Sequence, residues 1–130
     1  MEILLAIFGV GLLASLVGGG GSDGGLENEE PDLTDEGTPG PDVLLGTPLD
    51  DVIFGRGGND TISGGIGNDY LDGNADDDEV YGEIGDDSLF GGDGDDALGG
   101  GTGDDFLRGG PGDDTLRGGA DDDLLEGAQN

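Results

Sequence analysis

Apolar and polar positions repeat every nine residues from Gly37 to Glu126, and this stretch of 90 residues divides without a gap into ten nonapeptides. We number these units 1 to 10. In every unit the first residue is Gly, the sixth is Asp and the eighth is aliphatic. The fourth is Gly in seven units, with Leu49, Asp76 and Asp121 in the others. Columns that stay in phase over this length predict a repeat architecture.

Each unit is predicted to hold a turn followed by a short strand. Its first six positions are rich in Gly, Asn and Asp, which favour turns and tolerate positive φ. The last three form a triplet, such as Thr61 to Ser63, whose middle side chain is buried. We therefore expect strands of three residues, and the density of Gly excludes a helix. The predicted core residues are Leu44, Ile53, Ile62, Leu71, Val80, Leu89, Leu98, Leu107, Leu116 and Leu125.

Strands this short cannot bury a face alone, so successive units must stack on one another. If two units make one coil, the strands alternate between two parallel sheets and the turns alternate between two sides. Ten units then give about five coils, and the sixth-position Asp recurs on the same side every second unit. One ladder consists of Asp42, Asp60, Asp78, Asp96 and Asp114, and the other of Asp51, Asp69, Asp87, Asp105 and Asp123.

The two aspartate ladders predict a bound cation. Carboxylates at the strand spacing of ~4.8 Å repel one another by a few kcal/mol. Ca²⁺ suits the spaces between them, because it takes about 6 to 8 oxygen ligands in adaptable geometry and Gly-rich turns supply carbonyls. Mg²⁺ fits less well, since it demands a strict octahedron and sheds water reluctantly. The chain has no His or Cys, which transition metals prefer.

Composition excludes several classes of protein. A net charge of -29 repels nucleic acid, so we expect no partner of that class. Asp-Asp pairs recur from turn to turn, which is typical of a binding array rather than of one catalytic pair, so we expect no enzyme. Ten aliphatic residues bury too little surface to order 90 residues unaided, so folding is expected to require Ca²⁺. A permanently disordered acidic chain is the alternative.

Three units, Gly64 to Asp72, Gly100 to Arg108 and Gly109 to Arg117, read GGIGNDYLD, GGTGDDFLR and GGPGDDTLR. They resemble the nonapeptide G-G-x-G-x-D-x-U-x of the RTX (repeats-in-toxin, haemolysin-type) calcium-binding family. The resemblance implies an all-β, right-handed parallel β-roll in an extracellular or cell-surface bacterial protein. It also implies that Ca²⁺ is held between same-side turns by aspartate carboxylates and turn carbonyls. The glycines expected to supply carbonyls are Gly65, Gly67, Gly92, Gly94, Gly101, Gly103, Gly110 and Gly112.

Five aspartates in each ladder leave four gaps, so we expect at most eight Ca²⁺ ions. The gap between Asp96 and Asp114 ranks first, because both of its turns match the repeat. The gaps from Asp69 to Asp87 and from Asp87 to Asp105 follow. Poorer sites are expected where the turns depart from the pattern, at Pro41, Leu49, Arg56, Asp76 and Glu83.

Residues 1–21 contain an apolar run, Ile3 to Val17, that predicts a short helix. It is interpreted as a signal peptide, a membrane anchor or a cap on the repeats. Residues 22–36 are predicted to be a disordered acidic linker, and 127–130 a tail. No cap is expected over Leu116 and Leu125, so this end is available to pair with another chain. The main hypothesis is calcium binding by an exported roll that folds on Ca²⁺. The alternative is a calcium-stabilised adhesive module that self-associates or attaches to a membrane.

Overall fold

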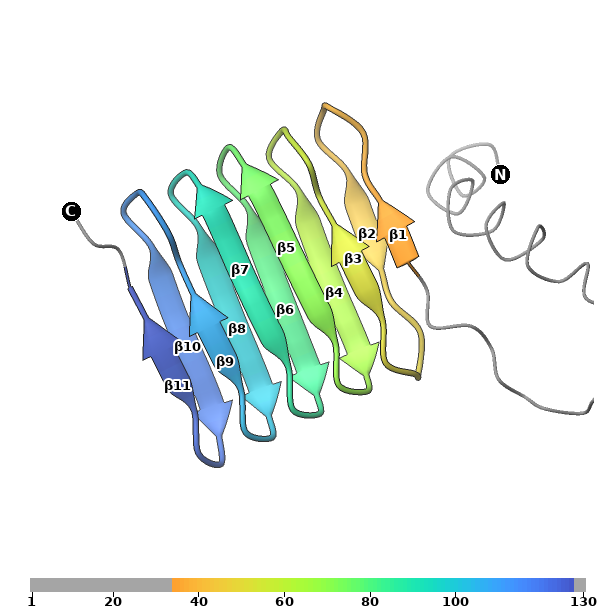
Figure 1. Ribbon diagram of the computed structural model, residues 1–130, viewed down its shortest axis with the longest axis vertical. Coiled ribbons are helices and arrows are strands. Elements are labelled where there is room, and N and C mark those ends of the chain that lie inside the picture. The colour runs from red at the N-terminus through yellow and green to blue at the C-terminus, as the bar shows by residue number, and fades with distance from the viewer. Residues whose placement is uncertain (1–33, 128–130) are drawn as a thin grey trace, which may run out of the picture.

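Residues 34–127 are described by the computed structural model, and they form a parallel β-solenoid of about five turns (Figure 1). No helix occurs within this range. The strands are β1 (Thr34–Glu36), β2 (Val43–Leu45), β3 (Val52–Phe54), β4 (Thr61–Ile66), β5 (Tyr70–Ala75), β6 (Glu79–Ile84), β7 (Ser88–Asp93), β8 (Ala97–Thr102), β9 (Phe106–Arg108), β10 (Thr115–Ala120) and β11 (Leu124–Glu126).

Successive strands alternate between two parallel sheets, as the repeat predicts. The odd-numbered strands form one sheet, in the order β1-β3-β5-β7-β9-β11, and the even-numbered strands form the other, in the order β10-β8-β6-β4-β2. Each strand pairs with the strand two units away, so that Leu71 lies opposite Ile53 on one side and Leu89 on the other. Figure 1 shows the turns gathered at the two ends of the strands.

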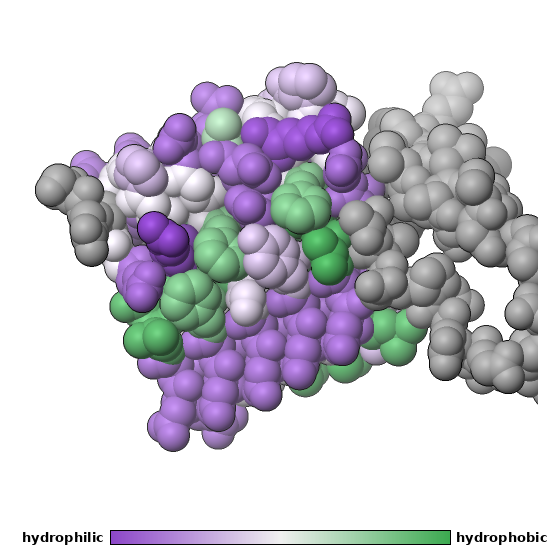
Figure 2. Space-filling model, viewed as in Figure 1, coloured by the Kyte–Doolittle hydropathy of each residue, from purple (hydrophilic) through white to green (hydrophobic). Residues whose placement is uncertain are grey.

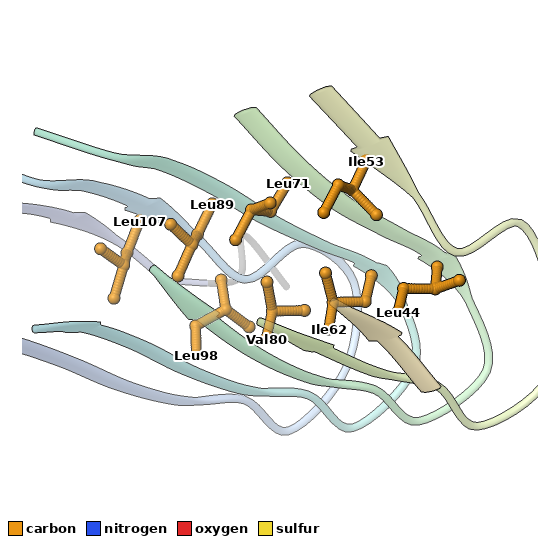
Figure 3. Close-up of a cluster of buried hydrophobic side chains, with 8 residues drawn as sticks. All are labelled: Leu44, Ile53, Ile62, Leu71, Val80, Leu89, Leu98 and Leu107. Atoms are coloured by element: carbon orange, nitrogen blue, oxygen red, sulfur yellow. The ribbon is translucent and has the colours of Figure 1, made fainter. Parts of the chain in front are cut away.

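The core is a double row of aliphatic side chains between the sheets. Figure 3 shows Ile53, Leu71, Leu89 and Leu107 facing the row from Leu44 to Leu98. All eight are at most 5% exposed, and each contributes roughly 2 kcal/mol by burial. Leu116 packs against this cluster, but Leu125 on the edge strand β11 is 42% exposed. The predicted core is therefore correct for its first eight residues and wrong for Leu125, because no further coil covers that residue.

Six of the described strands are longer than the three residues predicted. In β4 to β8 and in β10 the strand runs six residues, through the first three positions of the next unit. Backbone pairing resumes after the first-position Gly, as in the pairs Gly65–Glu83 and Ile66–Ile84 between β4 and β6. Glycine therefore does not end the strand here, because the stacked coil supplies hydrogen-bond partners on both sides of it.

The predicted linker is wrong at its last three residues, because Thr34–Glu36 forms β1 and pairs with β3. Asp35 lies opposite Ile53, in the position that an aliphatic residue occupies in every complete unit. Its side chain is 4% exposed, its Oδ1 has no hydrogen-bond partner, and burial raises its pKa. Asp35 stands nine residues before Leu44, so the register of the repeat already includes it. Because the residue in the aliphatic column is polar, the sequence pattern did not identify this partial unit.

The outer face of the six-stranded sheet carries four aromatic rings that alternate between two rows of residues from strand to strand. Phe54, Tyr70, Phe90 and Phe106 come from four neighbouring strands, and consecutive ring centroids lie 5.9, 5.0 and 5.7 Å apart. Figure 2 shows a hydrophobic band across this face and regular rows of hydrophilic residues below it, over the turns that follow the even-numbered strands. Tilted contacts at these distances stabilise neighbouring strands.

The predicted signal peptide or anchor in residues 1–21, and the linker up to residue 33, lie outside the described residues. Between residues 34 and 127 no helix is long and apolar enough to cross a membrane.

Candidate metal centre

The sixth-position aspartates form two ladders, one along each row of turns. In each ladder Oδ1 of one aspartate accepts a hydrogen bond from the backbone N–H of the aspartate 18 residues earlier. Asp60 N–H donates to Asp78 Oδ1 at 2.8 Å, and Asp69 N–H donates to Asp87 Oδ1 at 2.8 Å. The same bond joins the other neighbours in the two ladders, from Asp42 to Asp114 and from Asp51 to Asp123. The two predicted ladders are therefore present.

The second carboxylate oxygen, Oδ2, is left without a partner in most of the turns. It is buried and makes no hydrogen bond in seven successive aspartates: Asp60, Asp69, Asp78, Asp87, Asp96, Asp105 and Asp114. A buried carboxylate oxygen without a donor costs free energy, because the water that it gives up is not replaced. Seven such atoms in register point to a group that is supplied from outside the chain.

Each of these Oδ2 atoms lies over the first-position Gly of its own unit, and in five of the seven turns a carbonyl oxygen of the next coil lies beside it. A Cβ built on Gly100 would lie 2.1 Å from Asp105 Oδ2 and 2.6 Å from the carbonyl oxygen of Gly118. At Gly73 the corresponding distances are 2.2 Å to Asp78 Oδ2 and 2.7 Å to the carbonyl oxygen of Gly91. Only glycine leaves this space free, which explains the invariant first column.

This set of oxygens fits a hard cation. Ca²⁺ takes carboxylate and carbonyl oxygens at about 2.3–2.6 Å in adaptable geometry. The first-position carbonyls were not among the ligands predicted from the sequence, although the invariant glycine column marks them. Among the described residues no three Asp or Glu side chains converge on one point. Any ion here would therefore draw part of its coordination from the backbone.

The eight glycines that the sequence nominated lie in the stacked turns, and all eight have positive φ. Their stacking places carbonyls of one turn against the next. The Gly92 carbonyl oxygen would be 2.2 Å from a Cβ on Gly110, and that of Gly94 would be 1.7 Å from a Cβ on Gly112. These carbonyls therefore line the gaps between coils, and their role as calcium ligands stays a prediction.

Burial changes the acidity of the ladders. Desolvation, and next to it the charge of the neighbouring aspartates, raises the pKa of Asp78 to about 7 and that of Asp87 to about 6. The hydrogen bond from the preceding aspartate N–H opposes this rise but does not cancel it. The pKa values of Asp60, Asp69, Asp96 and Asp105 are also raised, with burial as the main cause. A raised pKa means that each of these carboxylates favours a bound proton or a bound cation more than a solvent-exposed aspartate does.

A second set of side chains links the turns and was not foreseen. Fifth-position Asp and Asn accept from the N–H of the residue one coil later, as when Asn68 N–H donates to Asp50 Oδ1 at 2.7 Å. Asp104 N–H donates to Asp86 Oδ1 at 2.9 Å in the same way. These residues are exposed, and their bonds run opposite to those of the sixth position. The signal in the sequence was Asn or Asp at position five in nine of ten units.

Several departures from the pattern are accommodated. Asp76 and Asp121 replace the fourth-position Gly and still adopt positive φ, at 76° and 83°. Arg56 also has positive φ, 82°, and its guanidinium donates to the carboxylate of Glu36 on β1. The positive charge of Arg56 is therefore paired with a carboxylate on β1.

Comparison with known proteins agrees with the geometry of the turns. The family described as the RTX calcium-binding nonapeptide repeat matches the chain in four copies, at residues 36–71, 63–98, 72–107 and 99–129. Neither a search of curated proteins nor a search of solved structures finds a match. The family is a structural calcium-binding module and not a known family of enzymes. With matches from residue 36 to residue 129, the chain belongs to the RTX calcium-binding nonapeptide repeat family.

Proposed function

We propose that this chain binds Ca²⁺ in the gaps of both aspartate ladders and folds when it does so. The observation that carries the proposal is the set of seven buried Oδ2 atoms without a donor. In five of these turns the carbonyl oxygen of the next coil's first-position Gly is also within 2.8 Å of the glycine Cβ position. Ca²⁺ between these oxygens would supply the positive charge that the turns lack.

Folding on calcium follows from what the rest of the molecule provides. The described residues have one row of aliphatic side chains per sheet as their core. Eight fully buried aliphatic residues are few against the conformational entropy of about 90 ordered residues, many of them Gly. Without the cation, the repulsion between the buried carboxylates and their desolvation would further destabilise the folded state. The free energy of Ca²⁺ binding is therefore part of the free energy of folding.

The proposed role is binding rather than catalysis, because the array offers many equivalent positions and no single distinct one. A module that folds on Ca²⁺ suits a bacterial protein that works outside the calcium-poor cytosol. The right-handed winding is proposed from the general preference of parallel crossovers. Residues 1–21 as export or membrane-anchoring segment, and 22–33 as linker, belong to the same proposal.

The experiment is a calcium titration of the full chain, followed by circular dichroism and by equilibrium dialysis. Strand signal should appear with Ca²⁺ and should not appear with the same concentration of Mg²⁺. Asp96→Asn keeps an oxygen for the 2.9 Å bond from Asp78 N–H but removes the charge, so it should bind fewer ions and need more calcium to fold. Asp95→Asn makes the same change at an exposed neighbour and should behave like the parent chain.

Two results would count against the proposal. One is a strand signal that is already complete in excess chelator. The other is an Asp96→Asn variant whose ion count and folding midpoint equal those of Asp95→Asn.

A second candidate role is calcium-dependent self-association through the β11 end of the roll. Leu124 and Leu125 on this edge strand are 58% and 42% exposed, and β11 pairs with β9 on one side only. An unpaired edge beside exposed leucines is suited to another copy of the chain. Light scattering in Ca²⁺ should then show an oligomer that Leu124→Lys abolishes, whereas a monomer at all concentrations tested would exclude this role.

A further inference from the structure

The turns of units 1 and 2 differ from all later turns in how they treat the sixth-position aspartate. Unit 1 begins Gly37-Thr38-Pro39 and unit 2 begins Gly46-Thr47-Pro48. The Thr38 N–H and hydroxyl both donate to Asp42 Oδ2, at 2.5 and 2.9 Å. The Thr47 N–H and hydroxyl donate to Asp51 Oδ2 in the same way, at 2.5 and 3.1 Å. In these two turns Oδ2 therefore has two donors from its own unit.

From unit 3 onward the residue at position two takes a different conformation. All eight of these residues have positive φ, from 78° at Asn74 to 126° at Gly119. Their N–H groups are directed elsewhere, as at Gly92, where the N–H donates to the carbonyl oxygen of Gly109. Seven of the eight aspartates in these units keep an Oδ2 without a partner. The dividing line between the two kinds of turn falls between Asp51 and Asp60.

The Thr-Pro sequence accounts for the change. A β-branched residue strongly disfavours positive φ, so Thr holds position two in the ordinary region. The proline that follows has φ near −65°. The Thr hydroxyl also accepts from the N–H at position four, at 3.3 Å from Gly40 and 3.2 Å from Leu49. Neither Gly40 nor Leu49 has positive φ, so position four needs no glycine in this kind of turn. Leu49 departs from the repeat pattern, but it is accommodated in this kind of turn.

We propose that Thr38 and Thr47 take the place of a calcium ion at the first aspartate of each ladder. Each gap lies between two successive aspartates of a ladder and contains Oδ2 of the earlier one. In the gaps that begin at Asp42 and Asp51, this Oδ2 already accepts hydrogen bonds from Thr donors. Ions then bind only in the three later gaps of each ladder. This inference rests on the proposed calcium binding and sharpens it, because it lowers the expected number of ions from eight to six.

Two swaps of turn type test the assignment in opposite directions. Thr47→Gly with Leu49→Gly gives unit 2 the turn Gly-Gly-Pro-Gly-Asp-Asp that unit 9 already has, and should raise the ion count from six to seven. Arg56→Thr with Gly57→Pro gives unit 3 the Thr-Pro start of unit 1, its neighbour on the same side, and should lower the count to five. A Cβ on Gly57 would meet nothing within 4 Å, so the ring has room.

Ions are counted by equilibrium dialysis, and circular dichroism in excess Ca²⁺ confirms that each chain has folded. Arg56→Ala is the control for loss of the ion pair with Glu36, and it should keep six ions. In the parent chain the NMR chemical shift of the Thr47 amide proton should be that of a hydrogen-bonded proton. It should not change through the second half of the calcium titration. Counts of six, seven and five establish the proposal. A parent count of eight, or folded swaps that leave the count unchanged, overturns it while leaving calcium binding intact. A count of zero instead refutes the proposed function.

Discussion

Asp87 is divided between two coils: its Oδ1 accepts a 2.8 Å hydrogen bond from the N–H of Asp69, and its Oδ2 is buried without any donor. The first contact fixes the register of one turn on the next. The second leaves negative charge in a place that water does not reach. One side chain therefore aligns the coils through Oδ1 and presents, through Oδ2, the oxygen that is proposed to bind calcium.

Protons should replace calcium in part, and this gives the metal-free chain an unusual pH dependence. The pKa values of Asp78 and Asp87 are about 7 and about 6 in the folded roll, above the ordinary value of 3.8. The folded state therefore binds more protons than the unfolded chain between pH 4 and 7. Stability from these groups is complete below about pH 4 and is lost as the pH rises through 6 and 7. Metal-stripped protein should show more strand signal at pH 5 than at pH 8.

Under the same linkage calcium must displace protons, so the calcium affinity should rise from pH 5 to pH 8. Circular dichroism and dialysis at the two pH values check both halves of this prediction. A metal-free chain that gains strand signal as the pH is raised would contradict it.

Gly100→Ala should disturb one calcium gap directly. The new methyl group would lie 2.1 Å from Asp105 Oδ2 and 2.6 Å from the Gly118 carbonyl oxygen, so both oxygens must move. We expect a loss of one bound ion and a shift of the folding midpoint to higher calcium. Gly57→Ala is the matched control, because its Cβ would meet nothing within 4 Å. Equal effects of the two alanines would show that the cradle over Gly100 has no part in binding.

Leu71 and Leu125 occupy the same column and should differ sharply in their contribution to stability. Leu71 is fully buried between coils, so Leu71→Ala should lower the free energy of unfolding by about 2–5 kcal/mol through lost contacts and a cavity. Leu125 is 42% exposed, and Leu125→Ala should cost less than about 1 kcal/mol. Urea unfolding in saturating Ca²⁺ measures both. The arrangement of the core is refuted if Leu125→Ala is the more damaging change.

Asp35 is a buried polar residue in an apolar column, and replacing it should stabilise the roll. Asp35→Leu removes a carboxylate that is 4% exposed, has an Oδ1 without a partner and lies opposite Ile53. We expect the free energy of unfolding to rise by about 1–3 kcal/mol at pH 7.5. Glu79→Leu makes a similar change at an exposed strand position and should have little effect. If Asp35→Leu destabilises the protein, Asp35 instead has a partner that matters.

Much of this architecture follows from one nonapeptide. The aliphatic eighth position, the Gly first position and the Asp sixth position predict the two sheets, the core from Leu44 to Leu107 and the two ladders. They do so because strands this short can bury a face only by stacking with a period of two units. Asp35 escaped prediction, since a single charged residue in the aliphatic column looks like linker until β1 is seen to pair with β3.

The period, the two sheets and the residues that line up on each side follow from the sequence alone, because a local pattern repeated in phase admits one kind of stacking. Which oxygen of each aspartate accepts a hydrogen bond depends on the folded arrangement of the coils. That outcome depends on an N–H one coil away and, in units 1 and 2, on the φ angle at Thr38 and Thr47. The bond to Oδ1 depends on a backbone N–H of the stacked coil, which no residue type within the unit specifies, whereas Thr at position two provides the donors to Oδ2 in units 1 and 2.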